Sequence, residues 1–339
     1  MSDYLLNCWY VAAWSEDVSG KPLARRLLDT PVVLYRRLDG RVVALHDRCP
    51  HRFVPLSIGK IDGDQIVCGY HGLRVDSDGS CVDTRLTGKA CEAARVRNFP
   101  VEDRDGIIWI WMGDPRQADT SRIVDFSFMT DPAHQMIRGT THVNAHYFLE
   151  VDNLLDLSHL DYVHLGSIAN GGLTTGKYSC HQEGDTVYSR WDSPDVPVPP
   201  QFAPHLPGVD RVDQWTDFRW NAPATLFLYN GVTRVGQARE AGIEVWQGHF
   251  VTPETEKSSH YFWGVAQAKE LLPPPMIGPI REMIRGVFEG EDLPVIEAQQ
   301  VNMKGVDIWK EHPVYFPEDA GAVRARKILE RMIREEAKK

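Results

Sequence analysis

Two closely spaced pairs of cysteine and histidine restrict the fold of this chain more than any other feature. Cys49 and His51 form the first pair, and Cys68 and His71 form the second. Each pair presents one thiolate and one imidazole from a single loop, and the strands between the loops set the distance from one pair to the other. The pattern therefore predicts a metal centre held between two hairpin tips.

Three interpretations compete for these four residues. A structural zinc ion accepts two cysteines and two histidines, but C-x-H is an unusual spacing for zinc. Four unrelated core residues are the second alternative, although two such tight pairs rarely arise by chance. The third is a [2Fe–2S] cluster of the Rieske type, in which two cysteines hold one iron and two histidines hold the other. We favour the third, because segments 49–52 and 68–72 closely resemble the Rieske motif.

Size and charge exclude several classes of protein. A length of 339 residues favours two domains, and 37 basic against 47 acidic residues leave a formal charge of −10. This balance argues against a nucleic-acid partner, since phosphates require a basic surface. Six cysteines are too few for a disulfide framework in so long a chain. With no basic signal region and no long apolar run, we expect a soluble, cytoplasmic protein that does not bind membranes.

The first third of the chain is rich in β signals. Runs of β-branched residues at 31–36 and 41–46 flank an Asp-Gly turn, which is a strong hairpin signal. The continuously apolar run at 106–112 is typical of a buried strand, and a Gly-Asp-Pro sequence follows it. We therefore expect an all-β domain over residues 1–115 and a second domain over 116–339.

The second domain mixes strands and helices. Aromatic-rich segments indicate successive antiparallel strands at 186–191, 214–220, 225–232, 243–251 and 260–265. Amphipathic spacing predicts helices at 151–164, 279–288 and 322–336. The expected fold class is α+β, in which the β domain precedes a catalytic domain whose antiparallel sheet is flanked by helices.

A second candidate metal site lies in the predicted helix at 151–164. Asp156 and His159 are three residues apart and share one helix face, whereas His159 and His164 are five apart and diverge by roughly 140° on an ideal helix. The two histidines share a metal only if the helix is distorted or ends near His164. The alternative is an amphipathic helix with two histidines at the edge of the core.

A non-haem Fe(II) site of this kind also needs a carboxylate. Two histidines and one carboxylate leave open positions for dioxygen and substrate. The best candidate lies in the acidic segment at 288–292, where we choose Asp292 ahead of Glu289 and Glu291.

Together these motifs resemble the terminal oxygenases of the Rieske non-haem iron family, in the vanillate O-demethylase branch that also contains dicamba and toluenesulfonate monooxygenases. The resemblance covers nearly the whole chain. Besides the metal motifs, it includes segments 7–12, 109–115, 152–156, 252–256 and 297–300. It implies a Rieske domain followed by a catalytic domain, and an enzyme that uses dioxygen.

The resemblance also implies the roles of individual residues. Cys49, His51, Cys68 and His71 correspond to the ligands of one [2Fe–2S] cluster, and His159, His164 and Asp292 correspond to the ligands of one mononuclear Fe(II). Asp156 corresponds to an acid that bridges a cluster histidine of one subunit to an iron-ligand histidine of the next. Such oxygenases are head-to-tail homotrimers, in which His71 of one protomer faces Asp156 and His159 of its neighbour.

The implied reaction is hydroxylation of a methyl group on a small aromatic substrate. A separate NAD(P)H-dependent reductase, with or without a ferredoxin, supplies the electrons. Aryl methyl ether O-demethylation, which releases formaldehyde, is the leading hypothesis. The alternatives are oxidation of an N-methyl group, of a ring methyl group or of a sulfonated aromatic, and a Rieske electron carrier without oxygenase activity.

Substrate contacts are the least constrained expectation. His249 matches a substrate-contacting histidine of the dicamba enzyme, and Asn153 is a further candidate contact. An aromatic acid would need a cation, for which Arg219 and Arg234 are candidates. Five aromatic residues are candidates for the pocket wall or for ordinary sheet core: Phe227, Tyr229, Trp246, Phe250 and Trp263.

Overall fold

The chain divides into two compact units in a computed structural model that describes residues 4–83 and 94–338. The first unit contains Tyr4–Asp125 together with Thr252–Thr255, and the second contains the remaining described residues. The division follows Asp125 rather than residue 115. The intervening polar segment belongs to the first unit, because Trp9 Nε1 donates to the Asp119 carbonyl at 2.8 Å.

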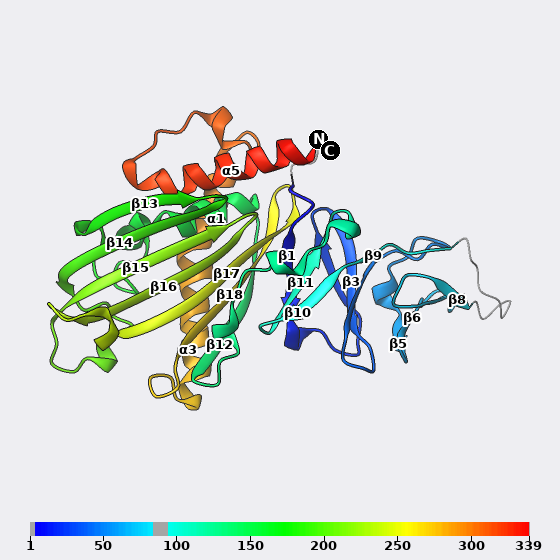
Figure 1. Cartoon of the computed structure of the whole chain (residues 1–339), viewed down its shortest axis with the longest axis horizontal. Helices are drawn as coiled ribbons and strands as arrows, with labels where there is room; N and C mark the ends of the chain where they lie inside the picture. The colour runs from blue at the N-terminus through cyan, green and yellow to red at the C-terminus, as the bar shows by residue number, and fades with distance from the viewer. Residues whose placement is uncertain (1–3, 84–93, 339) are drawn as a thin grey trace. The chain divides into compact units, whose positions relative to one another are not determined.

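Three small antiparallel sheets build the first unit (Figure 1). In spatial order they are β1 (Trp9–Trp14), β11 (Ile107–Trp111) and β10 (Val101–Arg104); β2 (Leu23–Leu27), β3 (Thr30–Arg36), β4 (Val42–His46) and β9 (Asn98–Phe99); and β5 (Lys60–Asp62), β6 (Gln65–Val67), β7 (Arg74–Val75) and β8 (Cys81–Asp83). The strands expected at 31–36, 41–46 and 106–112 are β3, β4 and β11. Every residue of β11 is buried, as its unbroken apolar run predicts.

One antiparallel sheet of seven strands forms the second unit. Its spatial order is β12 (His134–Val143), β18 (Ser258–Ala268), β17 (Ile243–Thr255), β16 (Thr225–Arg234), β15 (Arg211–Asn221), β14 (Thr186–Pro197) and β13 (Lys177–Glu183). The strands β13 to β18 follow one another as a meander, and β12 pairs with the last of them. The predicted α+β fold class is confirmed, although β12 and β13 were not expected.

Five helices accompany this sheet in the described residues (Figure 1). They are α1 (Tyr147–Leu155), α2 (Leu160–Val163), α3 (Pro274–Val287), α4 (Leu293–Asn302) and α5 (Ala320–Glu336). The helices expected at 279–288 and 322–336 correspond to α3 and α5, while a single helix over 151–164 is wrong because the chain leaves helical geometry at Asp156. No helix among the described residues is both long and apolar enough to span a membrane.

A buried ion pair joins α1 to α5. The Arg326 guanidinium donates through Nε to both carboxylate oxygens of Asp152, at 3.0 and 2.9 Å, and through its terminal nitrogen to the same group. The guanidinium also lies 4.6 Å from the ring centroid of Phe148. Burial raises the pKa of Asp152, and Arg326 opposes that shift. Because α1 leads directly into the predicted metal-binding segment, this pair holds that segment against the C-terminal helix.

Replacing Arg326 by alanine should lower the free energy of unfolding by about 3–5 kcal/mol, because it leaves the Asp152 carboxylate buried without its cation. Arg331→Ala is the matched control on the same helix. It breaks a pair with Asp185 in which the side chains are 45% and 50% exposed, so its cost should stay within about 1 kcal/mol. Urea unfolding followed by circular dichroism measures both. Equal losses in the two variants would contradict this role for Arg326.

Candidate metal centres and substrate cavity

The two Cys/His loops of the first unit have the same backbone structure. In the first loop, the Cys49 N–H donates to the carbonyl five residues on at 2.8 Å, and the Cys49 carbonyl accepts the N–H of Phe53 at 2.9 Å. In the second loop, Cys68 makes the equivalent bond at 2.8 Å and accepts the N–H of Gly72 at 3.0 Å. Phe53 and Gly72 both have positive φ, at 64° and 73°. The chain thus presents two copies of one turn.

These loops separate the thiols from the imidazoles. Cys49 and Cys68 are 1% and 2% exposed and belong to the hydrophobic core of this unit, whereas His51 and His71 are exposed. The two imidazole rings are 4.8 Å apart between centroids. Burial raises the pKa of the Cys49 thiol, and the neighbouring Cys68 thiol adds to that shift. If both thiols are ionised, their buried negative charge needs a metal centre to offset it, and the iron ions of a [2Fe–2S] cluster would do so.

The second predicted metal motif follows a break in the helix. Asp156 has φ −91° and ψ 83°, which ends α1, and its Oδ1 accepts hydrogen bonds from the N–H and hydroxyl of Ser158 at 3.1 and 2.5 Å. This cap begins a short 3-10 turn, Leu157–His159, and α2 then ends before His164. The helix is therefore both interrupted and ended, which removes the angular divergence that an ideal helix imposes on the two histidines.

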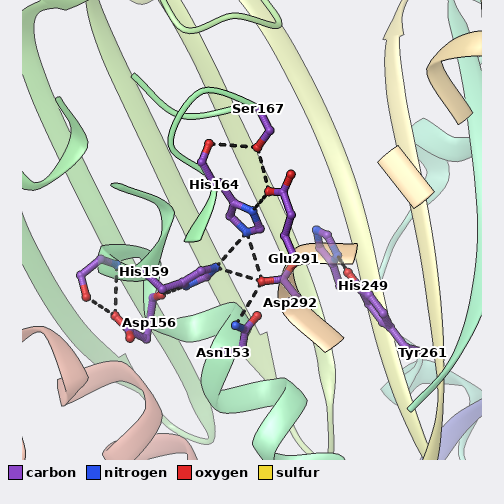
Figure 2. Close-up of polar contacts among 10 residues, drawn as sticks. Asn153, Asp156, His159, His164, Ser167, His249, Tyr261, Glu291 and Asp292 are labelled. Atoms are coloured by element: carbon purple, nitrogen blue, oxygen red, sulfur yellow. Dashed lines mark hydrogen bonds and ion pairs between the residues drawn. The ribbon is translucent and has the colours of Figure 1, made fainter. Parts of the chain in front are cut away.

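Three of the predicted ligands converge in the second unit. Figure 2 shows His159, His164 and Asp292 pointing toward one another. The two Nε2 atoms are 3.2 Å apart, and the Oδ1 of Asp292 lies 3.5 Å from His159 Nε2 and 3.1 Å from His164 Nε2. Ligand atoms about 2.1 Å from one metal ion are separated by about 3 Å at such angles. Among the described residues, these are the ones whose His, Cys, Asp or Glu ligand atoms lie close enough together to hold a single metal ion.

The far side of each imidazole is held by an oxygen atom. His159 Nδ1 contacts the main-chain carbonyl of Asp156, and His164 Nδ1 lies 2.6 Å from Oε2 of Glu291. Ser167 donates to the same Glu291 oxygen at 2.8 Å. These oxygens favour a proton on Nδ1 and leave the Nε2 lone pairs for a metal, which is the arrangement of metal-binding histidines. The residues present therefore fit a mononuclear non-haem iron.

The acidic segment reaches this site through a π-helical turn, Phe288–Asp292, between α3 and α4. Asp292 reaches Nε2 of His164 and Glu291 reaches its Nδ1, whereas Glu289 accepts a hydrogen bond from Thr141 at 3.3 Å. Burial would raise the pKa of Asp292, but the hydrogen bonds to His159 and His164 outweigh it and lower the pKa to about 2. Asp292 is thus ionised and placed to bind a metal.

Two further predicted residues contact this centre differently from expectation. Asp156 contacts His159 through its main-chain carbonyl, while its carboxylate binds Ser158. Asn153 donates to Oδ1 of Asp292 at 3.3 Å, so it contacts the proposed iron ligand itself. The bridging role of the Asp156 carboxylate and the substrate contact of Asn153 stay predictions.

A cavity of about 590 Å³ opens onto the three ligands. None of the five aromatic residues considered for its wall lines it, and neither do Arg219 and Arg234. The sheet contributes alternate residues instead: Gln214, Thr216 and Phe218; Leu228 and Asn230; Val245, Gln247 and His249; and Val265 and Gln267. Period-two alternation along each strand was the signal that sequence reasoning missed, because it places these residues on one face.

His249, the predicted substrate contact, is in the cavity wall. Its Nδ1 lies 2.7 Å from the hydroxyl of Tyr261, and its Nε2 is buried without a hydrogen-bond partner in the described part of the chain (Figure 2). Burial lowers the pKa of His249 to about 3, so the imidazole is neutral at physiological pH. The free nitrogen is available to a bound molecule, although a substrate contact stays a prediction.

Glu291→Gln should weaken iron binding by about 10- to 100-fold, because the carboxylate that holds His164 Nδ1 is lost. Glu289→Gln is the control, since that acid bonds to Thr141 rather than to a histidine. His159→Ala and His164→Ala should each deplete mononuclear iron while the cluster spectrum remains. Iron analysis after dialysis, with the visible spectrum as a check, measures the effect. Equal iron loss in the Glu289 and Glu291 variants would contradict this assignment.

Two known protein families match this chain, one in each part of the sequence. Residues 8–100 match the Rieske [2Fe-2S] domain, and residues 143–335 match the vanillate O-demethylase oxygenase C-terminal domain. The two matched families cover the two candidate metal centres separately. The expected order of domains is therefore confirmed.

Individual relatives extend over the full length of the chain. The oxygenase component of dicamba O-demethylase from Stenotrophomonas maltophilia is 37% identical over 98% of this chain and 99% of its own length. The oxygenase component of chloroacetanilide N-alkylformylase from Rhizorhabdus wittichii is 34% identical over 99% and 97%. The crystal structure of dicamba monooxygenase bound to dicamba superposes with a TM-score of 0.93, at 36% identity over 99% of both chains. The chain is thus an oxygenase component and an oxidoreductase, and it belongs to the Rieske oxygenases of the vanillate O-demethylase and dicamba monooxygenase branch.

Proposed function

We propose that this chain is the terminal oxygenase of a multicomponent monooxygenase that hydroxylates a methyl group of a small aromatic substrate. The convergence of His159, His164 and Asp292 in the wall of a cavity is the observation that carries this proposal. The proposed cofactors are one [2Fe–2S] cluster on Cys49, His51, Cys68 and His71, and one Fe(II). A separate reductase, directly or through a ferredoxin, brings electrons from NAD(P)H.

Aryl methyl ether O-demethylation is the preferred reaction. The iron supplies dioxygen activation when it is bound. One methyl ether, one O2, two electrons and two protons yield a phenol, formaldehyde and water, because hydroxylation of the methyl carbon produces a hemiacetal whose C–O bond breaks. Support comes from the relative whose name describes O-demethylation.

The protein's own residues position the substrate and limit side reactions. Leu160, Leu228 and Phe288 give the cavity an apolar surface, which excludes water from the reacting methyl group. His249 offers its free Nε2 to a polar group of the substrate. Glu291 and the Asp156 carbonyl hold the two histidines in place.

Electron transfer is proposed to occur between subunits. In a head-to-tail homotrimer, the exposed His71 of one protomer would face Asp156 and His159 of its neighbour. A heterologous interface closes into such a ring when its rotation is one third of a turn. The carboxylate oxygen of Asp156 that does not bind Ser158 is then available to a cluster histidine.

N-dealkylation is the second candidate reaction, because the chloroacetanilide relative is named for removal of a group on nitrogen. Oxidation of a ring methyl group or of a sulfonated aromatic uses the same site. The electron-carrier alternative is disfavoured, since a carrier needs neither the three converging ligands nor the cavity.

Purified protein with a matching reductase and NADH should consume oxygen and release formaldehyde from a panel of methoxy-substituted benzoates, benzamides and phenols. Its iron content should be about three per chain, against two for a carrier. Product analysis separates loss of an O-methyl group from oxidation of another methyl group. No oxygen uptake with any member of the panel would contradict the proposal.

Asp156→Asn should retain the cluster spectrum and the mononuclear iron yet lose most turnover, because an NH2 group replaces the free carboxylate oxygen proposed to accept a hydrogen bond from a cluster histidine. Ser158→Ala is the control, since it removes only the hydroxyl that binds the other side of this carboxylate. Single-turnover reduction of the iron by the prereduced cluster gives the direct readout. Wild-type transfer in Asp156→Asn would show that the bridging role is wrong.

A further inference from the structure

The cavity wall is mostly apolar, and its polar side chains are chiefly amides rather than cations. Neither lysine nor arginine is among its described lining residues. Its polar groups include seven side-chain amides, on Asn153, Asn170, Gln201, Gln214, Asn230, Gln247 and Gln267. Amides exchange hydrogen bonds with a ligand but do not neutralise its charge. A carboxylate or sulfonate bound away from the proposed Fe(II) would therefore lose its hydration without gaining a counter-ion from the wall.

Asp161 places a carboxylate in the same wall. The side chain is 7% exposed, and its Oδ2 accepts the N–H and hydroxyl of Thr174 at 2.7 and 2.8 Å. Its Oδ1 is buried without a hydrogen-bond partner in the described structure. An anion entering the cavity is repelled by this group, whereas an uncharged molecule with an N–H or O–H is not.

His249 does not provide the missing positive charge. Among the described residues, the Tyr261 hydroxyl has one acceptor within hydrogen-bond distance, the Nδ1 of His249. When the hydroxyl donates to Nδ1, the single imidazole proton lies on Nε2. Because burial holds the pKa of His249 at about 3, the cavity receives a neutral N–H donor that suits a carbonyl or ether oxygen.

Asn230 and Gln247 add a matched donor and acceptor. They lie on the neighbouring strands β16 and β17, and Gln247 Nε2 donates to Asn230 Oδ1 at 3.1 Å. Each amide uses one of its two polar groups in this contact. The pair consequently leaves one N–H donor and one carbonyl acceptor for a ligand, which is the complement of a carboxamide.

We propose that the substrate of this site is an uncharged aromatic molecule bearing an amide-like group, and that the cavity selects against carboxylates and sulfonates. The carrying observation is a wall with seven amides, the free Oδ1 of Asp161 and no lysine or arginine among the described lining residues. This inference rests on the proposed oxygenase function and specifies its substrate class.

Anaerobic calorimetry on the iron-loaded protein tests this selection without turnover. The probes are 2-, 3- and 4-methoxybenzamide and the three corresponding methoxybenzoates, at pH 7.5. At least one amide should bind ten-fold or more tightly than the acid of the same substitution pattern. Acids that bind as tightly as their amides, or no binding by any of the six compounds, would overturn the proposal.

Variants at one wall position separate charge from shape. Gln247→Lys should raise the affinity for the best-placed acid at least ten-fold, whereas Gln247→Met should weaken the amide several-fold and leave the acids unchanged. Gln182→Lys is the matched control, because it adds the same charge on the exposed strand β13. If Gln247→Lys misfolds, as its circular dichroism would show, the wild-type titration still decides the question.

The cavity wall contains four histidines. His159 and His164 are proposed iron ligands and His249 bonds to Tyr261, so His205 is the other imidazole that could act as a cation. Tight binding of an acid by the wild type that disappears in His205→Ala would identify this residue as a counter-ion and overturn the proposal. Absence of that effect, together with preferred amide binding, supports it.

Oxygen uptake distinguishes this inference from the oxygenase function. Turnover of acids but not of amides overturns the uncharged substrate and leaves the oxygenase proposal standing. Tight amide binding without oxygen uptake by any probe supports the uncharged substrate and counts against the oxygenase proposal.

Discussion

The meeting of two imidazoles and one carboxylate is the interaction on which the catalytic unit depends. His159 and His164 come from the segment after α1, and Asp292 comes from the turn between α3 and α4. Holding these polar atoms together under burial requires oxygens behind each imidazole, which the Asp156 carbonyl and Glu291 provide. The cavity, the adjoining sheet face and the buried pair behind α1 are arranged around this centre.

In the first unit, two loops with the same backbone hydrogen bonds carry the predicted cluster ligands. Cys49 and Cys68 begin turns with the same hydrogen bonds, although the histidine lies two residues after Cys49 and three after Cys68. Phe53 adopts in one loop the positive φ that Gly72 adopts in the other. Buried thiols and exposed imidazoles follow from this geometry, and they place the imidazole edge of the proposed cluster on the surface.

Substrate selection depends on a different part of the fold. The proposed metal ligands lie in segments that follow α1 and α3, whereas Gln214, Asn230, Gln247 and His249 belong to the sheet. The chemistry of the iron is therefore separable from the polarity of the wall. A chain can retain the ligand set of its relatives while the strands present other side chains to the substrate.

The sequence by itself indicated two domains and the α+β class, because strong periodicity is a local property. It also predicted Cys49, His51, Cys68 and His71 as one group from their close spacing, whereas the spacing of His159 and His164 left open whether they share a metal. It ranked Asp292 ahead of Glu289 and Glu291, but only the tertiary structure decided among them, because the π-helical turn sets which acid reaches which atom of His164. The break at Asp156 likewise required the capping contact with Ser158 to be seen. The cavity wall depended on strand register, which joins residues distant in sequence. The five aromatic candidates for the wall lie outside it, and amide side chains are among the residues that line it.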